Sequence, residues 1–267
     1  MTASPDILAR LALAQAIGRA AGVKALDYFN RRDQLVIEEK ANPQDVVSIA
    51  DREVEQLIRA EIAALYPDDG VLGEEYGSTD GTSGFTWVVD PIDGTSPFVF
   101  GMPNWCVSIA VVKNEALVIG VVYAPVTDDL YAAASGHGAT LNGKRLKLDP
   151  ARTIANSIVG IGSNHHADPA EVGGVIEKLL SQGGNFFRNG SGAMMLAYVA
   201  AGRLAGYYEP SMNAWDCLGG YCLVAEAGGW HLPFPLHGDQ LTQRAPVCAA
   251  GPGAKNELCA LIGGLNS

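Results

Sequence analysis

The most constraining feature of this sequence is an apolar run that ends directly in two carboxylates and a tight turn. Residues 87–89, Trp-Val-Val, are followed at once by residues 90–95, Asp-Pro-Ile-Asp-Gly-Thr. Proline and glycine fix the bend, so Asp90, Asp93 and the Ile92 carbonyl can converge on one point. Hard cations such as Mg²⁺ bind oxygen ligands of this kind. The motif therefore predicts a metal site at a strand end, with an ordinary Asp-Gly turn as the alternative.

Two helical stretches precede this strand, and several strand-like runs follow it. Apolar residues recur at three- and four-residue intervals across 6–30, with Ile17, Val23 and Phe29 among them, and again across 50–65. This spacing is typical of amphipathic helices. Short β-type runs then occupy 106–112, 116–123 and 130–133, and the pair Asn142-Gly143 predicts a hairpin. We expect a mainly antiparallel sheet in this part of the chain.

The second half of the chain alternates between the two kinds of element. Strand-like runs at 157–161, 186–187 and 205–209 alternate with helical stretches at 171–180, 191–201 and 216–226. Such alternation favours an α/β sheet. We place an internal boundary near residues 149–150. It divides the chain into an N-terminal half, 1–150, with most of the metal ligands, and a C-terminal half, 151–267, that packs with it as one unit.

Composition excludes several classes of protein. Of the 267 residues, 48% are hydrophobic and 18% are charged, which excludes a disordered chain. The net charge of -11 and the lack of a basic run argue against a nucleic-acid partner. We find no membrane span or signal peptide, and five cysteines without a CxxC pair suit a reducing compartment. We therefore expect a cytoplasmic protein without a membrane partner.

Three further acids stand where they could join the same site. Glu74 ends an apolar run, Asp216 begins a helical stretch, and Asp51 begins the second helix. Each also has a plain structural explanation, as a loop acid, a first-turn acid or a helix cap. Together with the hexapeptide they supply about five oxygen ligands, enough for paired metals that clamp a phosphoryl transfer. Asp51 could also polarise the Thr95 hydroxyl and so orient a nucleophilic water.

These motifs resemble those of the inositol monophosphatase family of Mg²⁺-dependent, lithium-sensitive phosphatases. The resemblance spans nearly the whole chain and runs through residues 45–51, 73–75, 90–95, 190–193, 207–209, 215–216 and 226–229. It implies an α+β fold, a layered αβαβα sandwich of the inositol monophosphatase and fructose-1,6-bisphosphatase type. It also implies a homodimer that acts on a small phosphorylated substrate.

The resemblance assigns the metal ligands residue by residue. It implies that Glu74, Asp90 and the Ile92 carbonyl bind one Mg²⁺, while Asp90, Asp93 and Asp216 bind another, so that Asp90 bridges the two. We expect about two or three Mg²⁺ ions as the cofactor, in keeping with multi-metal phosphoryl-transfer sites.

The resemblance also implies how water and phosphate are held. Glu74, together with Asp51 and Thr95, would position the attacking water, and the backbone amides of Gly94 and Thr95 would bind the phosphate. Lys40 falls near the active-site lysine of the family. The expected activity is that of a phosphoric monoester hydrolase.

Substrate choice rests on two features that point in different directions. Glu209 stands seven positions before Asp216, where inositol-specific members use a glutamate to contact ring hydroxyls, and the loop with Ser191 and Gly192 would also touch the ring. These residues favour inositol 1-phosphate. Residues 96–98, however, read Ser-Pro-Phe where inositol-type members have Thr-Asn-Phe, and Pro97 stiffens the loop and removes an amide donor. Histidinol phosphate, a 3′-phosphonucleotide, or a regulatory binding role with vestigial activity are the alternatives.

Overall fold

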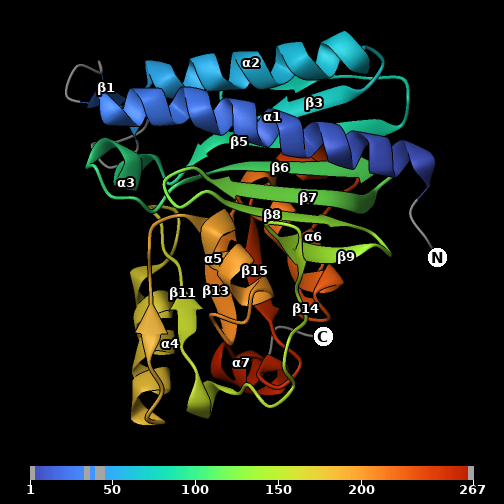
Figure 1. The fold of residues 1–267 in the computed structure, drawn as a ribbon. Helices are drawn as coiled ribbons and strands as arrows, with labels where there is room; N and C mark the ends of the chain where they lie inside the picture. Colours follow the sequence, from blue (N-terminus) through green and yellow to red (C-terminus); the bar gives the residue numbers. More distant parts are fainter. Residues whose placement is uncertain (1–3, 33–36, 40–45, 264–267) are drawn as a thin grey trace.

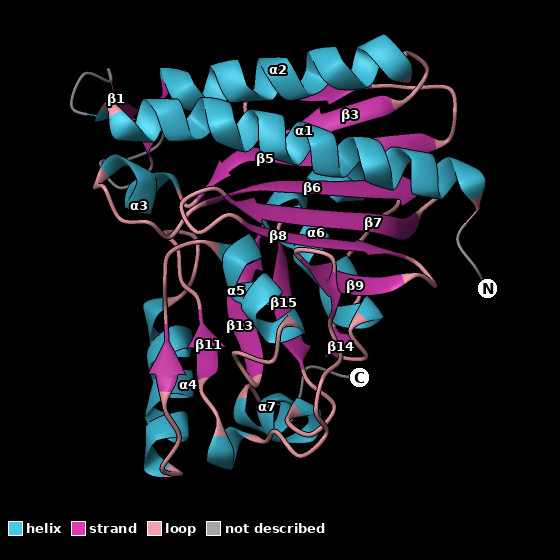
Figure 2. Ribbon diagram, in the orientation of Figure 1, coloured by secondary structure: helices cyan, strands magenta, loops and turns pink. Residues whose placement is uncertain are grey.

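Five alternating layers of helices and sheets make up the computed structural model, which describes residues 4–32, 37–39 and 46–263 (Figure 1). Helices α1 (Pro5–Asn30) and α2 (Ile49–Leu65) cover one face of an eight-stranded sheet. Helices α5 (Gly192–Ala200) and α6 (Ala214–Glu226) lie between that sheet and a five-stranded sheet. Helices α4 (Pro169–Ser181) and α7 (Lys255–Leu261) pack on the five-stranded sheet from outside (Figure 2). The expected αβαβα layering is confirmed.

The eight-stranded sheet is antiparallel except at one pair. Its order is β10-β9-β8-β7-β6-β5-β3-β4, and only β3 and β5 run parallel. The strands are β3 (Gly70–Gly73), β4 (Gly77–Thr79), β5 (Phe85–Asp93), β6 (Cys106–Lys113), β7 (Ala116–Ala124), β8 (Asp129–Ala134), β9 (Gly138–Leu141) and β10 (Lys144–Arg145). Between β9 and β10, Asn142 and Gly143 both have positive φ, 48° and 76°. The predicted hairpin is confirmed, because a tight turn of this kind requires positive φ at both central residues.

The five-stranded sheet of the second half, where alternation favoured an α/β sheet, is mixed. Its order is β12-β11-β13-β15-β14, where β12, β11 and β13 are parallel and the other two neighbours are antiparallel. The strands are β11 (Val159–Ile161), β12 (Phe186–Phe187), β13 (Gly206–Met212), β14 (Trp230–His231) and β15 (Ala245–Ala250). The remaining short elements are β1 (Ile37–Glu39), β2 (Val46–Ser48), α3 (Thr95–Val99) and the 3₁₀ turns η2 (Ile154–Asn156) and η3 (Gly238–Thr242).

Helix α1 packs on the sheet through small residues rather than through the whole predicted apolar stripe. Ile17 and Phe29 are buried as expected, whereas Val23 is 64% exposed. A Cβ built on Gly22 would lie 2.4 Å from the Tyr123 ring, so glycine lets the helix approach β7 closely. The position of α1 is therefore set by close backbone approach as well as by bulky side chains.

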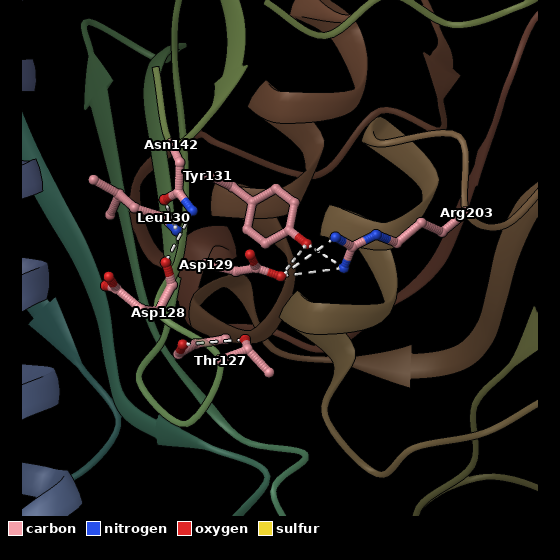
Figure 3. Close-up of polar contacts among 8 residues, drawn as sticks. Thr127, Asp128, Asp129, Leu130, Tyr131, Asn142 and Arg203 are labelled. Atoms are coloured by element: carbon pink, nitrogen blue, oxygen red, sulfur yellow. Dashed lines mark hydrogen bonds and ion pairs between the residues drawn. The ribbon is translucent and has the colours of Figure 1, made fainter. Parts of the chain in front are cut away.

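A polar cluster joins the middle helix layer to the eight-stranded sheet (Figure 3). Arg203, which follows α5, donates from Nη1 to Tyr131 Oη at 2.8 Å and lies 3.3 Å from Asp129 Oδ2 on β8. Next to it, the Asn142 side chain bonds the amide of Leu130 and the carbonyl of Asp128, which fixes the β9–β10 turn against β8. The Arg203 contacts fix the chain after α5 against β8.

One apolar core is shared by both parts of the chain. It includes Val88 of β5, Leu196 of α5 and Leu223 of α6 in a single cluster of buried side chains. The boundary near residues 149–150 stays a prediction. Among the described residues, none of the helices has both the length and the apolar character that crossing a bilayer requires.

Candidate active site

An irregularity in strand β5 brings its two aspartates to the same face. Asp90 pairs with Ser108 of β6 and Asp93 pairs with Cys106, so three steps along β5 match two along β6. Side chains alternate between the faces of a strand, and residues three apart would normally point to opposite sides. The one extra residue is a β-bulge, which restores the match. Both carboxylates therefore reach the site at the end of β5.

Close packing of α6 on the sheet delivers the third aspartate. A Cβ built on Gly120 of β7 would lie 2.2 Å from the carbonyl oxygen of Gly219, so only glycine lets the helix approach this closely. Asp216 lies in the first turn of α6, and its Oδ2 accepts a hydrogen bond of 3.1 Å from the amide of Asn213. The capping role considered from sequence is thus real, and both hydrogen bonds from Asn213 reach the same oxygen, Oδ2.

Three carboxylates converge at this point. One oxygen each of Asp90, Asp93 and Asp216 lies within 4.8 Å of the other two. Burial, and then the charge of Glu74, raise the pKa of Asp90 well above its usual value. Burial and the charge of Asp216 raise the pKa of Asp93 to about 7, and burial raises the pKa of Asp216. A group of buried acids that repel one another fits a divalent cation, and an all-oxygen donor set fits Mg²⁺.

Glu74, Asp51 and Thr95 surround the same point from neighbouring elements. Strand β3 runs parallel to β5, and Glu74 follows its last residue at the rim of the cavity. Asp51 of α2 is 1% exposed, and the Thr95 hydroxyl lies 3.5 Å from its Oδ1 and 3.3 Å from the Ile92 carbonyl oxygen. The structure therefore gathers the residues that the sequence only suggested. Lys40 lies outside the described residues.

The turn that follows β5 requires a glycine. Gly94 has φ 97°, and a Cβ there would lie 2.7 Å from the carbonyl oxygen of Asn104. Helix α3 then begins at Thr95, so the backbone of Gly94 and Thr95 lines the cavity next to the aspartates. This close approach of backbone to the site suits contact with a small anion.

Ser191 and Gly192 both line the cavity, but the Ser191 side chain faces a carboxylate. Ser191 is 1% exposed, and its Oγ donates to Asp93 Oδ2 at 2.5 Å. The amide of Ala193 donates to the same oxygen at 2.7 Å. These two bonds orient the Asp93 carboxylate through Oδ2. In this structure the Ser191 hydroxyl therefore orients Asp93, one of the expected metal ligands.

Glu209 lies on β13, on the wall of the cavity. It is 8% exposed, and Asn164 Nδ2 donates to its Oε1 at 2.8 Å while the Tyr207 hydroxyl donates to Oε2. Burial raises the pKa of Glu209, and these two hydrogen bonds act in the opposite direction. Two donors therefore fix the carboxylate, and each oxygen keeps a lone pair for a further donor.

The residues converge on a cavity of about 620 Å³. Its lining combines carboxylates with amide and basic side chains. The lining includes Glu74, Asp90, Ile92, Asp93, Gly94, Thr95, Pro97, Asn164, His165, Arg188, Asn189, Ser191, Gly192, Tyr207, Glu209, Asn213, Asp216 and Arg244.

Comparison with known proteins decides the family. The model of the inositol monophosphatase family matches residues 8–265. The chain belongs to the inositol monophosphatase family. A relative named inositol-1-monophosphatase, from Rhizobium meliloti (strain 1021), is 37% identical over 239 residues, 88% of this chain and 89% of the relative. A relative named Nus factor SuhB, from Xylella fastidiosa (strain Temecula1), is 36% identical over 222 residues, 81% of this chain and 78% of the relative.

The fold of a solved family member matches closely as well. The crystal structure of the extragenic suppressor protein suhB from Bartonella henselae superposes with a TM-score of 0.88 at 29% identity, covering 96% of this chain and 98% of that one. Membership in the inositol monophosphatase family implies phosphatase activity on small phosphorylated substrates, in a family that is generally Mg²⁺-dependent. The acidic cluster of this chain is consistent with that chemistry.

Several residues of this site were given no role from the sequence. Tyr207 lies two residues before Glu209 and so shares its face of β13, a signal that alternation along a strand could have given. Asn164 and Arg188 lie in loops, and only the tertiary fold brings them to the cavity. No local pattern marks them.

Proposed function

We propose that this chain hydrolyses inositol 1-phosphate to inositol and phosphate. The observation that carries the proposal is the convergence of three carboxylates, Asp90, Asp93 and Asp216, in a cavity that Glu209 also lines. The similarity to a relative named inositol-1-monophosphatase supports the choice of substrate.

The metal ligands follow from the donor set. Glu74, Asp90, the Ile92 carbonyl, Asp93 and Asp216 would hold Mg²⁺ in this proposal. When bound, the metal lowers the pKa of a coordinated water and neutralises the negative charge on the phosphate. Asp93 is kept in orientation by hydrogen bonds from its neighbours, so little reorganisation is needed on binding.

The remaining groups would align the water and the phosphate. Glu74, at the rim beside Asp90, accepts a proton from the attacking water. The Thr95 hydroxyl, held between Asp51 and the Ile92 carbonyl, fixes the position of that water. The backbone amides of Gly94 and Thr95 donate to phosphate oxygens. In this proposal the leaving group would contact Glu209, which lines the same cavity.

The Glu209 wall suits a leaving group rich in hydroxyls. Asn164 and Tyr207 hold the carboxylate still, and its remaining lone pairs can accept hydrogen bonds from ring hydroxyls. A site built to bond a hydroxyl strongly rejects an analogue that lacks one. Ser191 and Gly192 line the same cavity.

Phosphate release from inositol 1-phosphate tests the proposal. We expect release to require Mg²⁺, and Asp93→Asn to lower kcat/KM by several orders of magnitude, on the order of 10³-fold, through loss of charge stabilisation. Asp80→Asn, at an exposed aspartate away from the cavity, is the matched control. Undiminished turnover in Asp93→Asn would sink the assignment.

A second substrate class is favoured by the basic groups of the cavity. Arg188 and Arg244 line it, and Pro97 replaces an amide donor at its edge. These groups suit a leaving group with its own anionic charge, such as a 3′-phosphonucleotide. A panel of inositol 1-phosphate, histidinol phosphate and a 3′-phosphonucleotide at fixed Mg²⁺ discriminates them. A higher kcat/KM on either of the last two would replace inositol 1-phosphate as the substrate.

A binding role is the candidate from a different class. It rests on the similarity to a relative named Nus factor SuhB. The intact set of carboxylates at Glu74, Asp90, Asp93 and Asp216 argues for turnover instead. Absence of turnover on the whole panel, with a partner whose binding survives Asp93→Asn, would favour this role. The homodimer stays a prediction, tested by sedimentation of the purified chain.

A further inference from the structure

Glu55 is a buried carboxylate that the proposed chemistry does not use. It lies in α2, one helical turn after Asp51, and its side chain is 0% exposed. Its burial is costly unless hydrogen bonds or a counter-charge compensate for lost water. It does not line the cavity that holds the proposed metal ligands. Its role must therefore be inferred from its hydrogen-bond partners.

The partners of Glu55 are the backbone groups immediately after Glu74. The amide of Glu75 donates to Glu55 Oε2 at 2.7 Å, and the amide of Tyr76 donates to Oε1 at 3.2 Å. Hydrogen bonds of amides to an ionised acceptor are stronger than neutral ones. The two bonds fix the turn that links β3 to β4 and that begins with Glu74.

A second residue of α2 braces the same turn. Arg59 donates from Nε to Glu55 Oε1 at 2.8 Å, and the same guanidinium bonds the Gly77 carbonyl and, at 3.2 Å, the Thr79 hydroxyl. Arg59 thus supplies the counter-charge that a buried carboxylate needs. The α2 helix holds the turn through both residues.

The residue before Glu74 is equally constrained. A Cβ built on Gly73 would lie 2.1 Å from Glu55 Oε1. Only glycine leaves room for the carboxylate at this position. Glu55 therefore packs against the backbone on one side of Glu74 and hydrogen-bonds the backbone on the other side.

We propose that Glu55 is a positioning residue that fixes Glu74 relative to Asp51 and Thr95. The proposal rests on the proposed role of Glu74 as a metal ligand and water-positioning group. Because Asp51 and Glu55 lie one turn apart on α2, a single rigid helix sets the distance between the groups on either side of the attacking water. Helix α2 thereby aligns Glu74 with the Thr95 hydroxyl.

The first test compares two glutamates of the same helix. Glu55→Gln keeps one acceptor oxygen, replaces the other with a donor that faces an amide, and removes the charge opposite Arg59. We expect Mn²⁺ affinity, measured by isothermal titration calorimetry, and kcat/KM each to fall about 10- to 100-fold. Glu53→Gln is the control, because Glu53 bonds the Tyr28 hydroxyl at 2.6 Å and Lys24 at 2.9 Å, away from the turn. Equal effects of the two substitutions overturn the proposal.

Hydrogen exchange separates positioning from folding. In Glu55→Gln the amides of Glu75 and Tyr76 should exchange faster, while the amides of the β5–β6 pairing keep their protection. Global loss of protection instead identifies a purely structural role and overturns the proposal. Arg59→Gln is the milder second variant, since Arg59 is 18% exposed, and we expect a smaller loss of Mn²⁺ affinity in the same direction.

A double-mutant cycle with Glu74→Gln decides whether Glu55 acts through Glu74. If it does, Glu55→Gln lowers Mn²⁺ affinity in the wild-type background and changes it less than about 2-fold in the Glu74→Gln background. Equal effects in both backgrounds overturn the proposal. An unchanged Mn²⁺ affinity in Glu74→Gln alone contradicts instead the metal-ligand role of Glu74, so the two failures are distinguishable.

Discussion

Ser191 joins the start of α5 to the carboxylate end of β5. Its hydroxyl donates to Asp93 Oδ2 and accepts from the amide of Met194 at 3.3 Å, so one oxygen serves both the site and the helix cap. We expect Ser191→Ala to lower kcat/KM by about 10-fold or more, because Asp93 loses a charge-assisted bond. The lost cap should cost about 1 kcal/mol of unfolding free energy, measured by urea denaturation.

Ser191→Thr is the matched control, because it keeps the hydroxyl and so should retain most of kcat/KM. If both variants lose activity equally, the side chain acts through its fit in the buried pocket, and the hydrogen bond to Asp93 is not what matters. Unchanged kcat/KM in Ser191→Ala contradicts the prediction outright.

For single residues, the sequence identified the carboxylates of the site better than the side chains that orient them. Asp90 and Asp93 lie in one short motif, and local geometry is enough to predict their convergence. Glu55 reads as an ordinary helix acid, since its burial depends on the approach of a turn 20 residues away. Asn164 is brought to Glu209 across 45 residues. Contacts of this range have no periodic signal in the sequence.

Among the helices and strands, the long ones with a clear pattern of apolar and charged residues could be predicted from the sequence. Helix α2, Ile49–Leu65, is confirmed within one residue of the expected start, because its apolar residues alternate clearly with charged ones. Strand β15, Ala245–Ala250, was not predicted, since alanines and a proline give it little β propensity. Pairing with β13 on one side and β14 on the other stabilises it as a strand.

The contact between Arg203, which follows α5, and strand β8 yields a prediction for stability (Figure 3). Arg203→Met removes the bond to the Tyr131 hydroxyl and the ion pair with Asp129, and we expect about 1 kcal/mol loss of unfolding free energy. The ion pair adds little, because the Arg203 side chain is 44% exposed. Urea denaturation measures the loss, and kcat/KM should not change.

Arg19→Met provides the comparison for that measurement. Arg19 pairs with Asp128 at 2.8 Å, but both side chains are well exposed, so its removal should cost less than that of Arg203. An equal or greater loss for Arg19→Met would contradict the larger contribution assigned to the Arg203 contacts.

In the whole molecule, the site depends on three layers at once. Asp51 and Glu55 come from the outer helices, Asp90 and Asp93 from the eight-stranded sheet, and Asp216 from the middle helices. A ligand that binds only the folded state stabilises it by an amount set by concentration and affinity. A cation held by these layers should therefore stabilise the molecule as a whole.

The pH dependence of stability tests this coupling in the metal-free protein. The pKa of Asp93 is raised from 3.8 to about 7 in the folded state, mainly by burial. Between these pH values the folded protein holds a proton that the unfolded chain has released, so stability falls as pH rises. His231, whose pKa is lowered by burial, acts in the opposite direction. Asp90, Asp216 and Glu209, whose pKa values are also raised, act in the same direction as Asp93. The informative comparison is therefore with Asp93→Asn, which removes the contribution of Asp93 and the repulsion that it exerts on Asp90.

We expect the urea midpoint of the wild type in EDTA to fall between pH 5 and pH 8 relative to that of Asp93→Asn. Added Mg²⁺ should raise the wild-type midpoint more at pH 8 than at pH 5, because ligands must lose their protons to bind metal. Asp93→Asn should show a much smaller increase at either pH. Identical pH profiles for the two proteins in EDTA would contradict the raised pKa of Asp93. An equal Mg²⁺ effect in both would show instead that the cation binds away from the three aspartates.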